Sequence, residues 1–198
     1  VTGTPSAVAA HNSTRDVPIV ISTVGDPLGS GLAVSLRRPG GNVTGLSNGV
    51  GTALYTKRLD LLRQILPDLR RVGFLYHPDN GSDVLGLRQF EDDCAILKFK
   101  PLPARVRKAE DLVAAFNTLQ REKAQGLIVA SNSSFNAWRE SIYEQAAKHR
   151  LPAMYGNSLL ADSRGLISYS TDNTDLYRRS AAYVLVNRPN PSDLIFGV

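Results

Sequence analysis

The alternation of short apolar runs with segments of helical periodicity is the feature that most constrains how this 198-residue chain folds. The runs are rich in Val, Ile, Leu and Tyr and are bounded by turn-forming residues, so we predict strands over residues 17–23, 72–76, 126–130, 152–155 and 165–169. Because these runs are continuous rather than strictly alternating, they are typical of strands that are buried on both faces of a sheet.

Apolar residues between these runs recur at intervals of three and four, which is the spacing of an amphipathic helix. One helix is predicted to start at Pro27, with Asp26 as its N-cap, and to end before Pro39. Further helices are predicted over residues 55–66, 84–97, 109–123, 136–150 and 174–187. Strands that alternate with helices indicate βαβ units, and therefore an α/β fold with mostly parallel sheet flanked by helices.

Composition and motifs exclude several classes of function. No run of about 18 apolar residues is present, so we expect no membrane span in this chain. The net charge is +5, but only residues 98–108 are densely basic, so we expect no nucleic-acid partner. Cys94 is the only cysteine and the histidines lie far apart, so we expect no metal site. Phosphate-binding, dinucleotide and nucleophile-elbow motifs are absent, and we expect neither an enzyme nor a cofactor.

The connections that follow the predicted strands are rich in Ser, Thr, Asn, Asp and Gly. The chain opens with a similar segment over residues 2–6, which is predicted to lead from the tail of a strand into a short helix. Helix capping explains about one such residue per helix, but it explains the polar run over residues 131–134 poorly. The carboxyl edge of a parallel sheet binds ligands, so these connections predict a polar site for a carboxylate or another small polar molecule.

The first 48 residues carry motifs that resemble a known family. The motifs are Val-Thr-Gly-Thr-Pro (1–5), Pro-Ile-Val (18–20), Val-Gly-Asp-Pro-Leu-Gly-Ser-Gly-Leu (24–32) and Arg-Pro-Gly-Gly-Asn-Val-Thr-Gly-Leu-Ser (38–47), with later matches at 57–59, 61–62, 149–153, 155–156 and 168–169. This pattern resembles the bacterial ABC transporter substrate-binding proteins, a family that includes tryptophan-binding, TrpX-like members. The resemblance runs over nearly the whole chain.

The resemblance implies a type I periplasmic-binding-protein fold with two Rossmann-like lobes, of which the amino-terminal lobe is incomplete. Residues 1–48 would be the remainder of lobe one, residues 49–173 lobe two, and residues 174–198 a helix and tail leading back towards the hinge, with a crossing strand over 45–51. It implies a solute-binding component of an ABC importer, which binds an amino acid or related carboxylate in the inter-lobe cleft and docks on a permease. A periplasmic or extracytoplasmic location and an upstream secretion signal are also implied.

The resemblance places the ligand on the same polar connections that the strand pattern indicates. The implied site residues are Thr4, Ser6, Gly25, Asp26, Asn80, Ser82, Ser131, Asn132, Ser133, Tyr155, Gly156, Asn157 and Asp172. Two of them have structural alternatives, since Asp172 could cap the helix over 174–187 and the ring of Tyr155 could fill the core. An alternative function is the effector-binding domain of a transcription regulator, which shares this lobe architecture.

Overall fold

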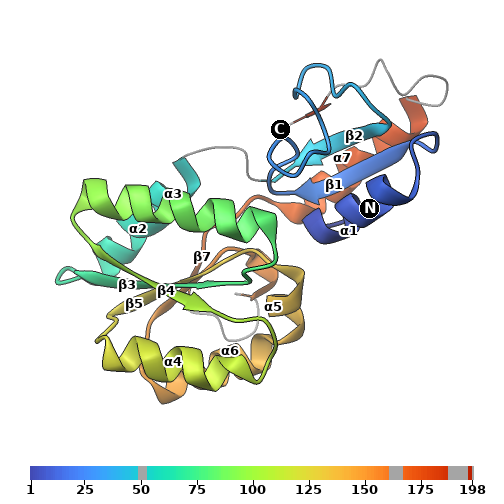
Figure 1. Ribbon diagram of the computed structural model, residues 1–198. Helices are drawn as coiled ribbons and strands as arrows, with labels where there is room; N and C mark the ends of the chain where they lie inside the picture. The colour runs from blue at the N-terminus through green and yellow to red at the C-terminus, as the bar shows by residue number, and fades with distance from the viewer. Residues whose placement is uncertain (49–52, 161–166, 187–195, 198) are drawn as a thin grey trace. The chain divides into compact units, whose positions relative to one another are not determined.

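The computed structural model describes residues 1–48, 53–160, 167–186 and 196–197 (Figure 1). These residues form two compact units. Unit 1 holds the described residues among 1–50, 80–82 and 171–198, and unit 2 holds those among 51–79 and 83–170. Both units are α/β, with parallel strands flanked by helices, which confirms the predicted fold class. No helix in the described ranges is both long and apolar enough to cross a membrane.

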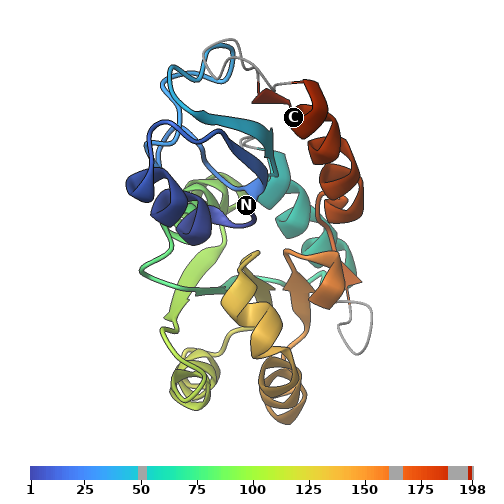
Figure 2. The ribbon, with the colours of Figure 1, turned by 90° about the vertical axis from the view of Figure 1, so that its right-hand side faces the viewer.

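Unit 1 is built on three parallel strands in the order β1-β2-β8, namely β1 (Ile19–Val24), β2 (Val43–Ser47) and β8 (Phe196–Gly197). Helices α1 (Thr4–Ser13) and α7 (Asn173–Val186) pack against these strands (Figures 1 and 2). A bridge between Thr2 and Thr23 precedes α1, which confirms the predicted strand-to-helix opening of the chain. The apolar core of the unit centres on Ile21, Leu32 and Val43.

Unit 2 is built on five parallel strands in the order β4-β3-β5-β6-β7. The strands are β3 (Arg71–Tyr76), β4 (Lys100–Arg105), β5 (Gly126–Val129), β6 (Ala153–Tyr155) and β7 (Ile167–Ser168). The helices are α2 (Ala53–Ile65), α3 (Gly81–Leu97), α4 (Asp111–Arg121), α5 (Ser133–Ala137) and α6 (Arg139–Lys148), with a 3₁₀ turn, η1, over Ser158–Leu160. Helices α2 and α3 cover one face of the sheet, and α4 and α6 lie side by side on the other (Figures 1 and 2).

Aromatic rings form the centre of the core between the sheet and helices α2 and α3. The ring of Phe74 on β3 stacks on Phe90 of α3 with centroids 4.8 Å apart and meets Tyr55 of α2 edge-on at 5.5 Å. All the residues of β5 and β6 are buried, as their continuous apolar runs predicted. Strands β5 and β6 are therefore packed on both faces, which fixes the start of the loops at their carboxyl ends.

The helix predicted to start at Pro27 is wrong, because residues 27–38 form turns and bends. Asp26 Oδ1 accepts hydrogen bonds from the amides of Leu28 and Gly29 at 3.2 and 2.9 Å, which closes a turn rather than capping a helix. Gly31 has φ of 70°, outside the helical range, and the glycines of this segment lower its helix propensity. The spacing of its leucines alone is therefore not enough to make a helix.

Strand β4 was not predicted, because Pro101 and Pro103 interrupt it and only alternate residues are apolar. The amides of Lys100 and Val106 donate to carbonyls on the β3 side, so the amide positions of residues 101 and 103 face away from the sheet. Proline at those two positions leaves no N–H for a further strand to pair with. The edge of the sheet is thereby protected against pairing with another chain.

Smaller differences concern the ends of the predicted elements. The helix predicted over 136–150 is two helices that meet at Trp138, and β8 was not predicted. Of the segment 45–51, where a crossing strand was expected, residues 45–47 belong to β2 (Val43–Ser47) in the unit 1 sheet, and residues 49–51 lie outside the described residues. Residues 165, 166 and 187, the ends of a predicted strand and helix, also lie outside them.

Candidate ligand-binding site

The carboxyl edge of the unit 2 sheet gathers the polar loops that follow β5 and β6. Asn132 is buried, and its Oδ1 accepts from the amide of Ser134 at 2.8 Å, which caps α5. The side-chain amide of Asn157 donates to Oδ1 of Asn136 at 3.2 Å, so the two loops are joined by a side-chain hydrogen bond. Ser131 is half-buried and Ser133 is exposed at the start of α5.

Gly156 is a point of close contact between these two loops. Its amide donates to the carbonyl of Val129 at 2.9 Å, and a Cβ atom placed on it would lie 2.9 Å from both that oxygen and the amide nitrogen of Ser131. Those neighbours are backbone atoms that cannot rotate away, so a larger residue would push the two loops apart. Glycine at this position lets Ser131 and Asn157 belong to one polar surface.

Asp83 is a part of this edge that the sequence analysis did not single out. Its side chain is 2% exposed, and Oδ2 accepts from the amide of His77 at 2.8 Å and from Nδ2 of Asn132 at 2.9 Å. The carboxylate therefore ties the loop after β3 to the loop after β5. Burial raises the pKa of Asp83 to about 7, although both hydrogen bonds oppose this shift. An Asp in the first turn of a helix is common, which is why its position in α3 gave no signal.

Arg58 on α2 is a second charged residue that the sequence analysis missed. It is 1% exposed, and its guanidinium donates from Nε to the carbonyl of Tyr169 at 2.8 Å and from Nη2 to the carbonyl of Gly156 at 3.2 Å. A signal was present in the sequence, because Arg58 lies three residues after Tyr55 and four before Leu62, on the apolar face of the predicted helix.

The ring of Tyr155 lies in the core of unit 2, with 2% of the residue exposed. It meets the ring of Tyr143 on α6 edge-on with centroids 5.6 Å apart, and the Tyr143 hydroxyl donates to the carbonyl of Leu160. This packing agrees with the core alternative for Tyr155. The backbone that follows it, at Gly156, still lies at the polar edge.

In unit 1 the site residues implied by the resemblance lie mostly in turns and caps. Thr4 is buried and its Oγ1 accepts from the amide of Gly25 at 3.4 Å, which joins the start of α1 to the end of β1. Ser6 is exposed on α1. Asn80 Oδ1 accepts from the amide of Ser82 at 3.1 Å, at the beginning of α3.

Asp172 fits the capping alternative. Its Oδ1 accepts from the amides of Thr174 and Asp175 at 2.9 and 3.1 Å, in the first turn of α7, and the residue is exposed. Capping accounts for its conformation without a ligand.

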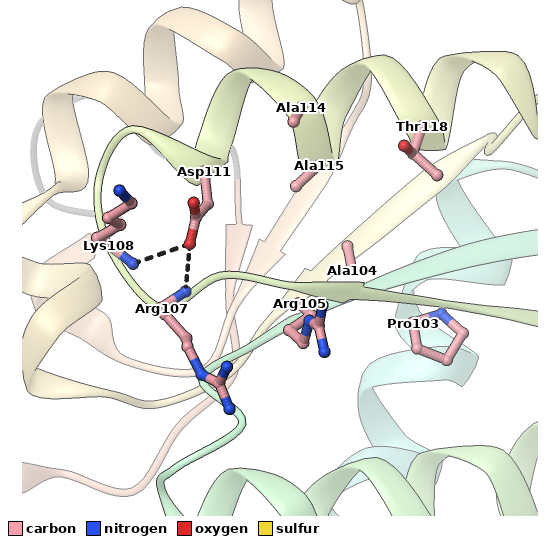
Figure 3. Close-up of a pocket in the computed structure, with 9 residues that line it drawn as sticks. All are labelled: Pro103, Ala104, Arg105, Arg107, Lys108, Asp111, Ala114, Ala115 and Thr118. Carbon is pink, nitrogen blue, oxygen red and sulfur yellow. Dashed lines mark hydrogen bonds between the residues drawn. The ribbon is translucent and has the colours of Figure 1, made fainter.

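A groove of about 680 Å³ lies between β4 and α4, away from the predicted site residues (Figure 3). The groove is lined by small residues such as Ala104 and Ala115 and by the cationic residues Arg105, Arg107 and Lys108 of the basic segment over 98–108. The side chain of Arg107 extends away from α4 and pairs with Asp79, with Nε 3.0 Å from Oδ2. Asp111 accepts from the amides of residues 107 and 108, and these hydrogen bonds hold its pKa below the ordinary value.

The charges of this basic segment are therefore partly paired within unit 2. Besides the Arg107–Asp79 ion pair, Lys100 Nζ lies 3.1 Å from Oε2 of Glu122. Across the described ranges, no group of three or more His, Cys, Asp and Glu side chains is arranged to hold a metal ion.

A parallel α/β architecture places hydroxyl and amide groups at the carboxyl edge of the sheet, where such folds bind small molecules, but the fold alone does not define a function. The sequence model of the ABC transporter substrate binding protein family matches residues 1–186. The chain therefore belongs to this family, as its motifs indicated.

Individual proteins resemble this chain in sequence or in fold. A tyrosine-binding protein of Clostridioides difficile is 42% identical over 89 residues, which are 45% of this chain and 25% of that protein. The structure of an ABC domain from Streptococcus pneumoniae in complex with L-Trp superposes with a TM-score of 0.88 at 20% identity, over 99% of this chain and 68% of that one. A conserved domain protein from Vibrio cholerae gives a TM-score of 0.90 at 24% identity, over 98% of this chain and 65% of that one.

These two superpositions establish the type I binding-protein fold that the resemblance implied. The chain spans about a quarter of the length of the tyrosine-binding protein and about two thirds of the two solved structures.

Proposed function

We propose that this chain belongs to the solute-binding component of an ABC importer and that its solute is an amino acid or a related carboxylate. The observation that carries the proposal is family membership over residues 1–186 combined with a carboxyl edge lined by Ser131, Asn132 and Asn157. Hydroxyl and amide groups of this kind recognise small polar solutes through hydrogen bonds. A relative named for tyrosine binding and a structural neighbour solved with L-Trp make aromatic amino acids the first solutes to test.

The proposed mechanism is binding without chemistry. In a two-lobed binding protein, a solute that contacts both lobes shifts the population towards a closed form, which would be the form that docks on the permease. We propose an extracytoplasmic location on the same grounds. A secretion signal upstream of residue 1 would support this location, whereas a DNA-binding helix-turn-helix there would support the regulator alternative.

Isothermal titration calorimetry of the full-length protein with L-tyrosine and L-tryptophan tests the proposed solute class. At least one of the two is expected to bind with a 1:1 stoichiometry. If neither binds, and native mass spectrometry of protein purified from cells shows a retained solute without a carboxylate, the proposed solute class is wrong while the family assignment stands.

Substitution of the polar edge tests where the solute binds. Ser131→Ala and Asn157→Ala are each expected to weaken solute binding by ~1–3 kcal/mol, since each would leave a polar group of the solute without its partner. We expect a similar effect for Asp26→Ala. Matched controls are Ser141→Ala and Asn117→Ala, which remove exposed side chains from α6 and α4 and should leave affinity unchanged. Unchanged affinity together with a lower melting temperature in the site variants would show that these residues only cap turns and helices.

A further inference from the structure

Arg58 is the bulkiest fully buried side chain among the described residues. A guanidinium is rarely placed in an apolar interior, because removing a charge from water is strongly unfavourable unless an opposite charge is close. Its place on α2 therefore needs an explanation beyond packing.

The partners of Arg58 supply hydrogen bonds but no negative charge. They are the carbonyls of Tyr169 and Gly156 and the ring of Tyr55, whose centroid lies 5.0 Å from the guanidinium carbon. Within the described ranges, none of the salt bridges involves Arg58. Burial lowers its pKa and the neighbouring Tyr55 opposes that shift, but a guanidinium stays protonated at neutral pH. Among its described residues, unit 2 thus pairs the Arg58 guanidinium with no carboxylate.

The two carbonyls lie where β6 and β7 end, at the polar edge of the sheet. The described peptide bonds are all trans, and in a trans peptide the N–H points opposite to the C=O. The amides of Asn157 and Ser170 therefore point away from Arg58. The guanidinium and these two peptide dipoles together present positive potential towards the side of the loops opposite Arg58.

We propose that Arg58 is a positioning residue whose buried charge, acting through the peptide units 156–157 and 169–170, makes the site selective for a solute carboxylate over its neutral amide. This inference rests on the proposed function and adds the group of the solute that the edge of unit 2 recognises. A purely structural Arg58 would tie the two loops together but would treat acid and amide alike. The ratio of the two affinities therefore separates the alternatives.

The test is calorimetry of the full-length protein with L-tyrosine and L-tyrosinamide, and with L-tryptophan and its amide. The wild-type protein should bind the acid at least about tenfold more tightly than the amide, and Arg58→Met should reduce that ratio about tenfold. Arg58→Lys should weaken both affinities but keep the ratio, because an ammonium retains the charge and cannot span both carbonyls. The matched control is Arg63→Met, which removes an exposed arginine paired with Asp60 from the same helix and should change neither affinity nor ratio.

Four outcomes would overturn the inference. If Arg58→Met weakens acid and amide equally, Arg58 is only structural and the proposed function stands. If Arg58→Met does not fold, the acid-to-amide affinity ratio is measured for Arg58→Lys. A lower ratio in this variant, which keeps the charge, contradicts a role for the charge. A wild-type protein that binds the amides as tightly as the acids excludes the inference without any variant, whereas one that binds none of the four compounds rejects the proposed aromatic solutes as well.

Discussion

Replacing Tyr155 with alanine is expected to lower the free energy of unfolding of unit 2 by ~3–5 kcal/mol, as large buried aromatic truncations do. The residue is 2% exposed, and its ring packs edge-on against Tyr143 between β6 and α6. Removing it leaves a cavity that strand and helix can fill only by moving towards each other. Chemical denaturation followed by far-UV circular dichroism measures the loss.

Tyr155→Phe separates the ring from its hydroxyl. It keeps the volume and the contact with Tyr143, so stability and solute binding are expected to stay close to those of the wild-type protein. Tyr177→Ala, which removes an exposed ring from α7, is a control that should cost little. If Tyr155→Ala keeps nearly the stability of the wild-type protein but no longer binds solute, the ring belongs to the binding site and not to the core.

Most of the strands that could be predicted from the sequence are buried on both faces, and the exception is β7, a half-buried strand at the edge of the sheet. Residues 72–76 and 126–130 are continuous apolar runs, and they form β3 and β5, two adjacent inner strands of the unit 2 sheet. Strand β4 lies at the edge, where Pro101 and Pro103 are tolerated because their missing amides face away from the sheet. Its position in the sheet, rather than its composition, makes it a strand.

At residues 27–38 a helix was predicted that the structure does not contain. Leucines at four-residue intervals favoured a helix, but Gly29 and Gly31 lower helix propensity, and Gly31 has φ of 70°, outside the helical range. The hydrogen bonds to Asp26 resemble those of a helix cap, so the glycines rather than the cap explain why no helix follows.

The polar edge was predictable as a set of loops, but its charged residues were not. Parallel strands bring their carboxyl ends to one edge, so the Ser and Asn residues after β5 and β6 could be grouped from the order of the elements alone. Burial of Arg58 and Asp83 depends on partners more than 40 residues away in the chain, such as Gly156 and Asn132. The place of Arg58 on the apolar face of its helix indicates burial, but neither residue gives a local sign of which partners it meets.

The stability of unit 2 is expected to fall as the pH rises from about 4 to above 7, because of Asp83. Burial raises the pKa of this carboxyl to about 7, whereas an unfolded Asp titrates near about 3.9. Between these two values the unfolded chain loses a proton that the folded chain keeps. The stability lost by ionising Asp83 is therefore zero below the pKa of the unfolded state and complete above the pKa of the folded state, where the loss is on the order of 4 kcal/mol.

Two substitutions at Asp83 separate its charge from its hydrogen bonds. Asp83→Asn keeps an oxygen that can accept from the His77 amide and the Asn132 side chain but does not titrate, so this variant should match the wild type near pH 4 and exceed its stability at pH 8. Asp83→Ala leaves both donors buried without an acceptor, and it should be roughly 2–4 kcal/mol less stable than Asp83→Asn at every pH.

Urea denaturation in steps from pH 4 to pH 8 measures these differences, and the fluorescence of Trp138, the single tryptophan, reports on unit 2. The matched control is Asp79→Asn on the same loop. Asp79 is exposed, and its hydrogen bonds with Arg107 hold its pKa below the ordinary value. Its carboxylate is therefore already charged in the folded state over this range, and the control should keep nearly the same pH dependence as the wild type. Parallel curves for wild type and Asp83→Asn would show that Asp83 ionises at its ordinary pKa, because its two hydrogen bonds then offset the effect of burial in full.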